Sequence, residues 1–505
     1  MKGEKSEADV GAFARVCATV RGRTMASGAA RPPDWVIVSL SCAGYFLVVV
    51  DVAVMNVALP SIRTALGFDA AHLQWVINGY ALAFAGFLLL GGRAADLYGR
   101  RRVFLAGLAV FVLASLAGGL AESPGVLVVA RFVQGIGAAV LSPASLTILV
   151  TAFPEGPLRA RAIGTWAALG AAGGAFGTLL GGVLTECLSW RSVLLVNVPV
   201  GTVVMLASAL FLTESRGGDS RRLDVPGAIT GTLGLTALSY GATQTGVYGW
   251  TSYRTLIPLA AGLVALAIFL AIQARFASHP LMPLRLFRSR AVSAAYAILV
   301  LVGAAYLSMF YFVSLYLQNV LGFGPLKSGL VLVPHSLGIA VGARAAPRLV
   351  SRIGTRPTIL VGTLVSAAGF LWQSRITDAN TILSGVICPG VLIALSGGIV
   401  SAPLIATATS GVERSEAGIV SGIANTARMA GGSLGLAALA AVASGRTQAL
   451  LVGRSHTTVQ MGEALTAGYS LVFVVSTFLL LIAAGAAEAL PEGTDKSVET
   501  KEVSS

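Results

Sequence analysis

Long apolar runs constrain this chain of 505 residues more than any other feature. A bilayer core of about 30 Å needs about 20 apolar residues per spanning helix. Runs of this kind recur at 35–59, 75–92, 103–121, 125–150, 162–185, 192–213, 226–247, 255–274, 292–317, 328–349, 358–376, 381–405, 417–444 and 466–488. With 55% hydrophobic residues, 11% charged residues and a mean hydropathy of +0.81, the composition excludes an ordinary water-soluble domain. The sequence therefore predicts an all-α, polytopic integral membrane protein with 14 transmembrane helices.

The start of the chain predicts an uncleaved first span. Residues 1–34 are basic and carry no apolar stretch, and the run at 35–59 is too long for the apolar core of a cleaved signal. Translation from Met1 and translation from Met25 both fit this pattern. The cysteines have no metal-binding spacing, so neither a structural zinc nor a disulfide is expected; they are Cys17, Cys42, Cys187 and Cys388.

The basic charge follows the predicted topology. If the N-terminus is cytoplasmic, 26 of the 35 Lys and Arg residues fall on the inner side and seven on the outer side. The opposite orientation would invert a strong positive-inside bias. We therefore expect both termini in the cytoplasm, a location in the cell membrane, some attraction to anionic lipid, and no nucleic-acid partner.

Two loops repeat one pattern. The loop after the second span reads Gly92-Arg-Ala-Ala-Asp96-Leu-Tyr-Gly99-Arg100. The loop after the tenth span contains a degenerate copy at 347–356, in which Gly354 corresponds to Gly99 and Ser351 stands at the acidic position. Superimposing the copies pairs spans 1–6 with spans 9–14 and leaves spans 7 and 8 as an inserted pair. Two parallel six-helix halves are typical of a secondary transporter that works by rocking. The predicted divisions are a cytoplasmic segment at 1–34, a first half at 35–213, a linker with the inserted pair at 214–291, a second half at 292–488 and a cytoplasmic tail at 489–505.

Asp51 is the one acidic residue inside a long apolar run. A bare carboxylate in hydrocarbon costs several kcal/mol, about 2.5 to 3.5 on insertion scales, so it must be neutral or paired. Asp51 is therefore a candidate functional residue, and a purely structural ion pair is the alternative. Residues 214–225 and 489–505, by contrast, read as polar segments without chemistry of their own.

The chain resembles the major facilitator superfamily, and its fourteen spans make it similar to the fourteen-helix drug:proton antiporter family. The first-span block from Asp51 through Asn56 to Pro60 is similar to a motif of that family. The loop residues resemble the superfamily's cytoplasmic gate motif at Gly92, Asp96, Gly99 and Arg100. The block Arg131-Phe-Val-Gln134 resembles one whose arginine the family implicates in proton transfer.

The fifth span resembles the antiporter motif of the same family. The matching glycines are Gly164, Gly173, Gly177, Gly181 and Gly182. Thr178 stands where the family has proline, which weakens the motif as a sign of export. The glycines also fit ordinary close packing between helices.

Helix geometry places the candidate site in the outer third of the membrane. At 1.5 Å per residue, Asp51 lies roughly 24 Å from the inner surface, and Arg131 and His335 lie roughly 9 and 11 Å below the outer surface. We therefore expect Asp51 and Arg131 to form a proton-coupling charge pair, with Asn56 and Gln134 as polar neighbours. Ion pairing favours the charged carboxylate and burial the neutral one, and these opposing effects suit a proton switch.

Further candidates for the cavity lie in the second half. They are Tyr306 and Phe310, which share a helix face, His335 after a proline, and Arg428 near mid-membrane. A packing role is the alternative for the two aromatic residues and for His335.

The leading hypothesis is a proton-driven exporter of a moderately hydrophobic drug or antibiotic, without cofactor, metal site or obligatory protein partner. No phosphate-binding loop of the ATPase type occurs in the sequence, so a proton gradient is the simpler energy source. A transporter of one metabolite, such as an amino acid, sugar or siderophore, remains an alternative on the same fold. A membrane enzyme or a receptor is disfavoured because no loop carries clustered acids and histidines.

Overall fold

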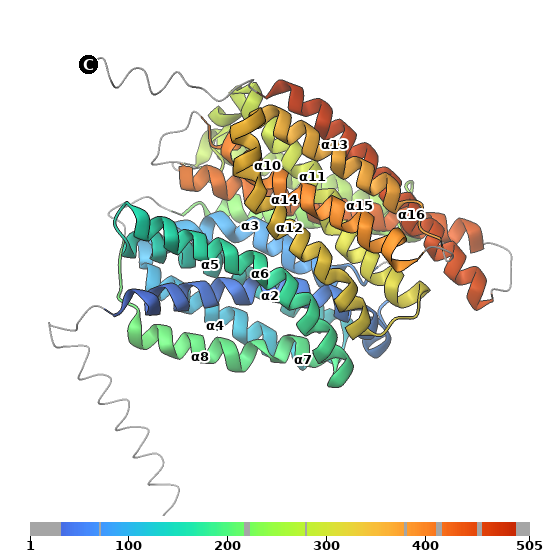
Figure 1. Cartoon of the computed structure of the whole chain (residues 1–505), viewed down its shortest axis with the longest axis horizontal. Coiled ribbons are helices and arrows are strands. Elements are labelled where there is room, and N and C mark those ends of the chain that lie inside the picture. The colour runs from blue at the N-terminus through green and yellow to red at the C-terminus, as the bar shows by residue number, and fades with distance from the viewer. Residues whose placement is uncertain are drawn as a thin grey trace, which may run out of the picture.

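The computed structural model describes residues 32–69, 72–216, 223–277, 280–377, 381–410, 417–451 and 457–490. These residues form helices joined by short connections, and no strand occurs among them (Figure 1). The helices of the first half are α2 (Asp34–Leu66), α3 (Trp75–Tyr98), α4 (Arg100–Gly119), α5 (Pro124–Ala152), α6 (Pro157–Cys187), α7 (Trp190–Leu195) and α8 (Asn197–Phe211). The helices that follow are α9 (Val225–Tyr248), α10 (Tyr253–Ala271), α11 (Arg290–Leu315), α12 (Pro325–Ile353), α13 (Thr355–Gln373), α14 (Cys388–Ala408), α15 (Ala417–Leu451) and α16 (Thr458–Ala486).

Every predicted span coincides with a helix, and the sixth span consists of two helices, α7 and α8, which meet at Val196. Within the described part of the chain, 12 helices are long and apolar enough to cross a membrane. The helices α9 and α13 complete the fourteen. Threonines and glycines make α9 less apolar, and α13 begins with a Thr-Arg-Pro sequence. Both helices are nevertheless packed against other spans, α9 against α3, α10 and α15, and α13 against α14 and α16.

Local sequence signals explain where several helices begin and end. Ser123 caps α5, its side chain accepting from the backbone of Val126, and Pro124 occupies the first turn, where no N–H donor is needed. At the other end of a helix, Gly67 stops α2 with a left-handed backbone, φ +70°, that a residue with a side chain rarely adopts.

The helices pack in two groups joined across a shared interface. In the first group, α2 packs on α6, and α5 packs on both α3 and α4. In the second group, α11 packs on α15, and α14 packs on both α12 and α13. Figure 1 shows α2, α4, α6 and α8 along the lower part of the molecule and α13 to α16 along the upper part. The groups meet mainly where α6 lies on α12 and where α3 lies on α15.

The hydrogen bonds between the two groups lie mostly at one end of the bundle. Among the described residues, they run from Ser314 to the Asn56 carbonyl (2.7 Å), from Gln318 to the Val57 carbonyl (2.9 Å), from the Leu326 amide to Glu186 (2.8 Å), from Ser433 to Asn78 (2.9 Å), and from Thr426 to the Ala85 carbonyl (3.1 Å). All but the last lie toward the end at which α2 connects to α3. The bundle is therefore closed at the α2–α3 end.

Candidate functional site

A hydrogen-bonded cluster around Asp51 lies inside the first group of helices. Asp51 and Arg131 are each 1% exposed, and Arg131 Nη1 donates to Asp51 Oδ2 at 2.5 Å. Oδ1 of Asp51 accepts from Gln134 Nε2 at 2.8 Å and from Asn197 Nδ2 at 2.9 Å. Ser115 Oγ accepts from Gln134 Nε2 at 2.7 Å. These five residues, which we call the Asp51 cluster, come from α2, α4, α5 and α8.

The guanidinium of Arg131 is held by more than the carboxylate. Its Nη1 also donates to Gln134 Oε1 at 2.6 Å, and its Nε donates to the Val76 carbonyl of α3 at 3.1 Å. Its Cζ lies 4.4 Å from the centre of the Tyr80 ring, within the range of a cation–π interaction. A buried ion pair is tolerated only when hydrogen bonds satisfy its remaining protons and lone pairs. The Asp51 cluster meets this requirement. Protonation of Asp51 would remove the negative charge that pairs with Arg131.

The structure brings Asp51, Arg131 and Gln134 together but leaves Asn56 out of the cluster. The side-chain amide of Asn56 donates to the Val52 carbonyl of its own helix at 3.1 Å. Five residues along a helix amount to about 140° of rotation, so Asn56 lies on a different side of α2 from Asp51.

The aromatic candidates of α11 are packed within the second group. The hydroxyl of Tyr306 makes a short hydrogen bond with Ser366 of α13, and its ring meets Phe370 edge-on with centroids 6.2 Å apart. Phe310 lies 6.4 Å from the His335 ring, centre to centre. His335 is fully buried and packs closely on Gly390 of α14. All of these contacts lie within the second group, and neither ring nitrogen of His335 has a hydrogen-bond partner among the described residues.

Arg428 is a partly exposed arginine in a membrane-spanning helix, α15. In the described part of the chain, no acidic side chain forms an ion pair with it. Tyr45 of α2 is near enough to Arg428 to interact with it electrostatically. The Tyr45 ring stacks on Trp166 of α6, with centroids 3.8 Å apart and planes inclined by 15°. The arrangement offers a cation near a flat aromatic surface between the two groups of helices.

The gate-like loop between α3 and α4 contains an ion pair, and a second carboxylate, that of Glu214, contacts the start of α4. Arg100 Nη2 contacts Asp96 Oδ1 at 2.9 Å, and Gly99 makes the turn with φ +105°. Glu214, which follows α8, accepts from the backbone amides of Arg101 at 3.2 Å and Arg102 at 3.1 Å. A carboxylate at this place stabilises the positive N-terminal end of α4. Gly92, the first residue of the loop motif, faces Pro143 of α5.

The glycines of the antiporter-like motif bring α6 against two helices. A Cβ on Gly177 would lie 2.7 Å from Ala53 Cβ, and a Cβ on Gly181 would lie 2.8 Å from the Val54 carbonyl, both in α2. Gly173 also faces α2, whereas Gly182 faces the start of α12. Gly164 has no neighbour of this kind within 4 Å. Four of the five motif glycines are therefore sites of close helix contact.

Three residues of these sites were missed from the sequence. Asn197 and Ser115 belong to the Asp51 cluster, and a buried asparagine in an apolar run is a signal that could have found the first of them. Glu214 was placed in a segment without chemistry of its own, which was wrong. Its role depends on a contact with residues more than 100 positions earlier in the chain.

The arrangement of long apolar helices in two packed groups, with a buried ion pair inside one of them, defines a multi-pass membrane transporter. The family model of the Major Facilitator Superfamily matches residues 41–436. The chain belongs to this superfamily.

Several relatives that match most of this chain are named as export or resistance proteins for an antibiotic. This chain is 49% identical to a cephamycin export protein of Amycolatopsis lactamdurans over 411 residues, which are 81% of this chain and 85% of that protein. It is 37% identical to a puromycin resistance protein of Streptomyces alboniger, covering 91% of this chain and 92% of that protein. A tetracenomycin C resistance and export protein of Streptomyces glaucescens is 34% identical over 84% of this chain and 78% of that protein.

Solved structures agree in fold. A structure from work on proton-dependent oligopeptide transporters superimposes with a TM-score of 0.64 at 16% identity, covering 90% of this chain and 99% of that one. A bacterial homologue of the lysosomal transporter Spinster gives a TM-score of 0.61 at 18% identity, over 92% of this chain and 98% of that one. At these identities the likeness concerns the fold alone.

Proposed function

We propose that this chain is a proton-coupled exporter of a moderately hydrophobic small molecule, such as an antibiotic, in the cell membrane. The observation that carries the proposal is the Asp51 cluster, a titratable carboxylate enclosed with Arg131 inside a transporter fold. The printed functions of the relatives, export of cephamycin and resistance to puromycin and tetracenomycin C, support the same substrate class.

The proposed topology places both termini in the cytoplasm, with residues 35–213 and 292–488 as the two moving halves. The α2–α3 connection then lies outside, and a bundle closed at that end faces inward. The segment between the two halves, residues 214–291, carries the linker and the inserted pair α9 and α10.

In the proposed cycle, Asp51 takes up a proton while the transporter faces outward and releases it while the transporter faces inward. Release restores the ion pair with Arg131, and the inward-facing protein with this ion pair is ready for substrate. Substrate loading then drives the return to the outward-facing state. The contact of Asp96 with Arg100 and the Glu214 contact keep the cytoplasmic ends of α3, α4 and α8 together, so that the first half moves as one unit.

We place the substrate between the halves, near Arg428 and the stacked pair of Tyr45 and Trp166. A flat ring system gains from stacking on such a surface. A cation without an acidic protein partner also favours substrates with a negative or electron-rich group.

The test is drug accumulation in a pump-deficient bacterial host that produces wild-type protein, Asp51→Asn or Asp34→Asn, with and without a protonophore. Asp34 is a matched control, because it lies in the same helix but at its exposed first turn. We expect wild type and Asp34→Asn to lower accumulation of some compounds, and the protonophore or Asp51→Asn to abolish this. Protonophore-sensitive export that survives in Asp51→Asn would place the proton site elsewhere, and no export of any compound would refute the drug-exporter assignment.

A further inference from the structure

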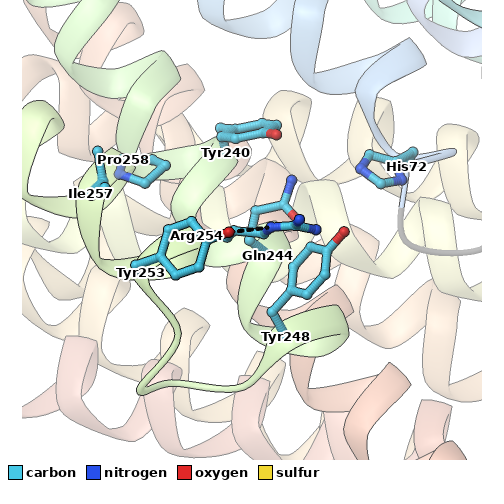
Figure 2. A pocket seen from close by; sticks show the side chains of 8 residues that line it. All are labelled: His72, Tyr240, Gln244, Tyr248, Tyr253, Arg254, Ile257 and Pro258. Carbon is cyan, nitrogen blue, oxygen red and sulfur yellow. Dashed lines mark hydrogen bonds between the residues drawn. The ribbon is translucent and has the colours of Figure 1, made fainter.

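A cavity of about 460 Å³ lies away from the Asp51 cluster, at the connected ends of α9 and α10 (Figure 2). Tyr240 and Tyr248 of α9 and Tyr253 of α10 supply aromatic walls, and His72, from the segment before α3, lies across from them. The cavity therefore joins the inserted helix pair to the first group of helices.

Gln244 gives this cavity an unsatisfied acceptor. The residue lines the cavity although it is only 3% exposed. Its Oε1 accepts no hydrogen bond from the described part of the chain. An unpaired buried acceptor lowers stability, so a ligand that donates a hydrogen bond at this place gains binding energy.

Arg254 gives the same cavity a cation held in a defined position. Its guanidinium lies 4.6 Å from the centre of the Tyr248 ring, and its Nε donates to the Tyr253 hydroxyl at 3.3 Å. No ion pair joins Arg254 to an acidic side chain in the described ranges. Figure 2 shows the guanidinium between the two tyrosine rings. Its remaining donors suit a phosphate.

The turn between the two helices holds these side chains in place. Gly249, with φ +79°, reverses the chain after α9, and its carbonyl accepts from Thr255 Oγ1 at 2.9 Å. Ser252 caps α10 by accepting from the Arg254 amide at 3.3 Å. The walls of the cavity are therefore preorganised.

An apolar stripe leads from the cavity along α10. Ile257 and Pro258 line the cavity about one turn beyond Arg254. Ile257, Val264 and Ile268 are 64%, 58% and 47% exposed, and their spacing places them on one face of the helix. In a membrane this face contacts acyl chains. A ligand that reaches from Arg254 onto this stripe needs an anionic group in its head and an apolar tail.

We propose that the cavity binds the headgroup of a phospholipid that carries a hydrogen-bond donor, with phosphatidylethanolamine as the ligand that fits best. The phosphate lies on Arg254, the ammonium donates to Gln244 Oε1 among the tyrosine rings, and an acyl chain follows the stripe. Tyrosines at a membrane surface are common as simple anchors. An anchoring belt, however, does not need a buried glutamine with an open acceptor.

Phosphatidylcholine distinguishes headgroup binding at Gln244 from simple anchoring by the tyrosines, because its choline headgroup carries the same charges but no N–H donor. Delipidated full-length protein is mixed with phosphatidylethanolamine or phosphatidylcholine of identical acyl chains, and native mass spectrometry counts the lipids bound. The variants are Gln244→Leu, Arg254→Gln and, as a control, Arg288→Gln, an exposed arginine outside the cavity. Thermal melting in lipid-free detergent shows whether each variant is folded.

We expect wild type and Arg288→Gln to bind phosphatidylethanolamine about tenfold more tightly than phosphatidylcholine, as the loss of one charge-assisted hydrogen bond implies. Gln244→Leu should lose this preference, and Arg254→Gln should weaken the binding of both lipids. Equal binding of the two lipids by wild type, or a preference that survives in Gln244→Leu, would overturn the proposal. If soluble glycerophosphoethanolamine displaces the lipid at equal concentration, the site belongs to a soluble zwitterion and the lipid assignment is wrong.

Discussion

Breaking the buried ion pair from its two sides should have unequal effects. Arg131→Met leaves the Asp51 carboxylate with two amide donors and no cation, whereas Asp51→Asn leaves Arg131 with the Val76 carbonyl, Gln134 and the Tyr80 ring. An uncompensated buried charge costs about 3–5 kcal/mol. At about 2 °C per kcal/mol for a large domain, Arg131→Met should melt roughly 6–10 °C below wild type. Asp51→Asn also leaves a buried charge without its ionic partner, so it should melt below wild type too, but by less, because the Val76 carbonyl, Gln134 and the Tyr80 ring still contact the guanidinium.

A double variant shows whether the stranded charge is the cause. Adding Asp51→Asn to Arg131→Met removes the unpaired carboxylate, so the double variant should recover most of the stability that Arg131→Met loses. Detergent-solubilised protein, followed by fluorescence-detected size exclusion after heating, gives the measurement. The reasoning fails if the double variant melts no higher than Arg131→Met, or if Asp51→Asn is the less stable single variant.

Three further variants test the other sites. Glu214→Gln should lower the melting temperature by about 2 °C, as expected for a lost anion worth about 1 kcal/mol at a helix N-terminus, whereas the exposed Glu155→Gln should leave it unchanged. Gly181→Ala should abolish export in the accumulation assay because its methyl group would press on a carbonyl of α2, whereas Gly164→Ala, which has free space, should export normally; equal export would refute the packing argument. Arg428→Gln should weaken export of anionic compounds by about tenfold or more and spare cationic ones, and a uniform loss would count against a charge contact with substrate.

Helix arithmetic explains why much of the site could be predicted. Asp51 and Arg131 are isolated charges in apolar runs, and a fixed rise per residue places both at one depth, where the structure joins them. Gln134 follows Arg131 by three residues and therefore shares its face. The prediction that Asn56 lies beside Asp51 was wrong, because it ignored the angle between the two side chains around α2.

The remaining contacts depend on tertiary structure. Asn197 reaches Asp51 across 146 residues. The helical rise places Asn197 at a similar depth, but it does not show which helices lie side by side or which faces they turn to each other. Glu214 likewise contacts the start of α4 from more than 100 positions later in the chain. The fourteen spans followed from hydrophobic length, but the helices extend past the apolar runs, as in α2, which continues through Pro60 to Leu66.

The enclosure of Asp51 bears on how proton and substrate are coupled. Both carboxylate oxygens accept hydrogen bonds from the protein and the Asp51 side chain is fully buried, so in this state a substrate cannot reach the carboxylate. Direct competition between drug and proton for the carboxylate is therefore disfavoured. Tyr45 lies six residues before Asp51 on the same helix and is within the electrostatic reach of Arg428. A shift of α2 on protonation of Asp51 would move the Tyr45 ring relative to Arg428. Protonation and substrate binding would then be coupled through α2, so the need for a proton would not depend on the charge of the exported compound.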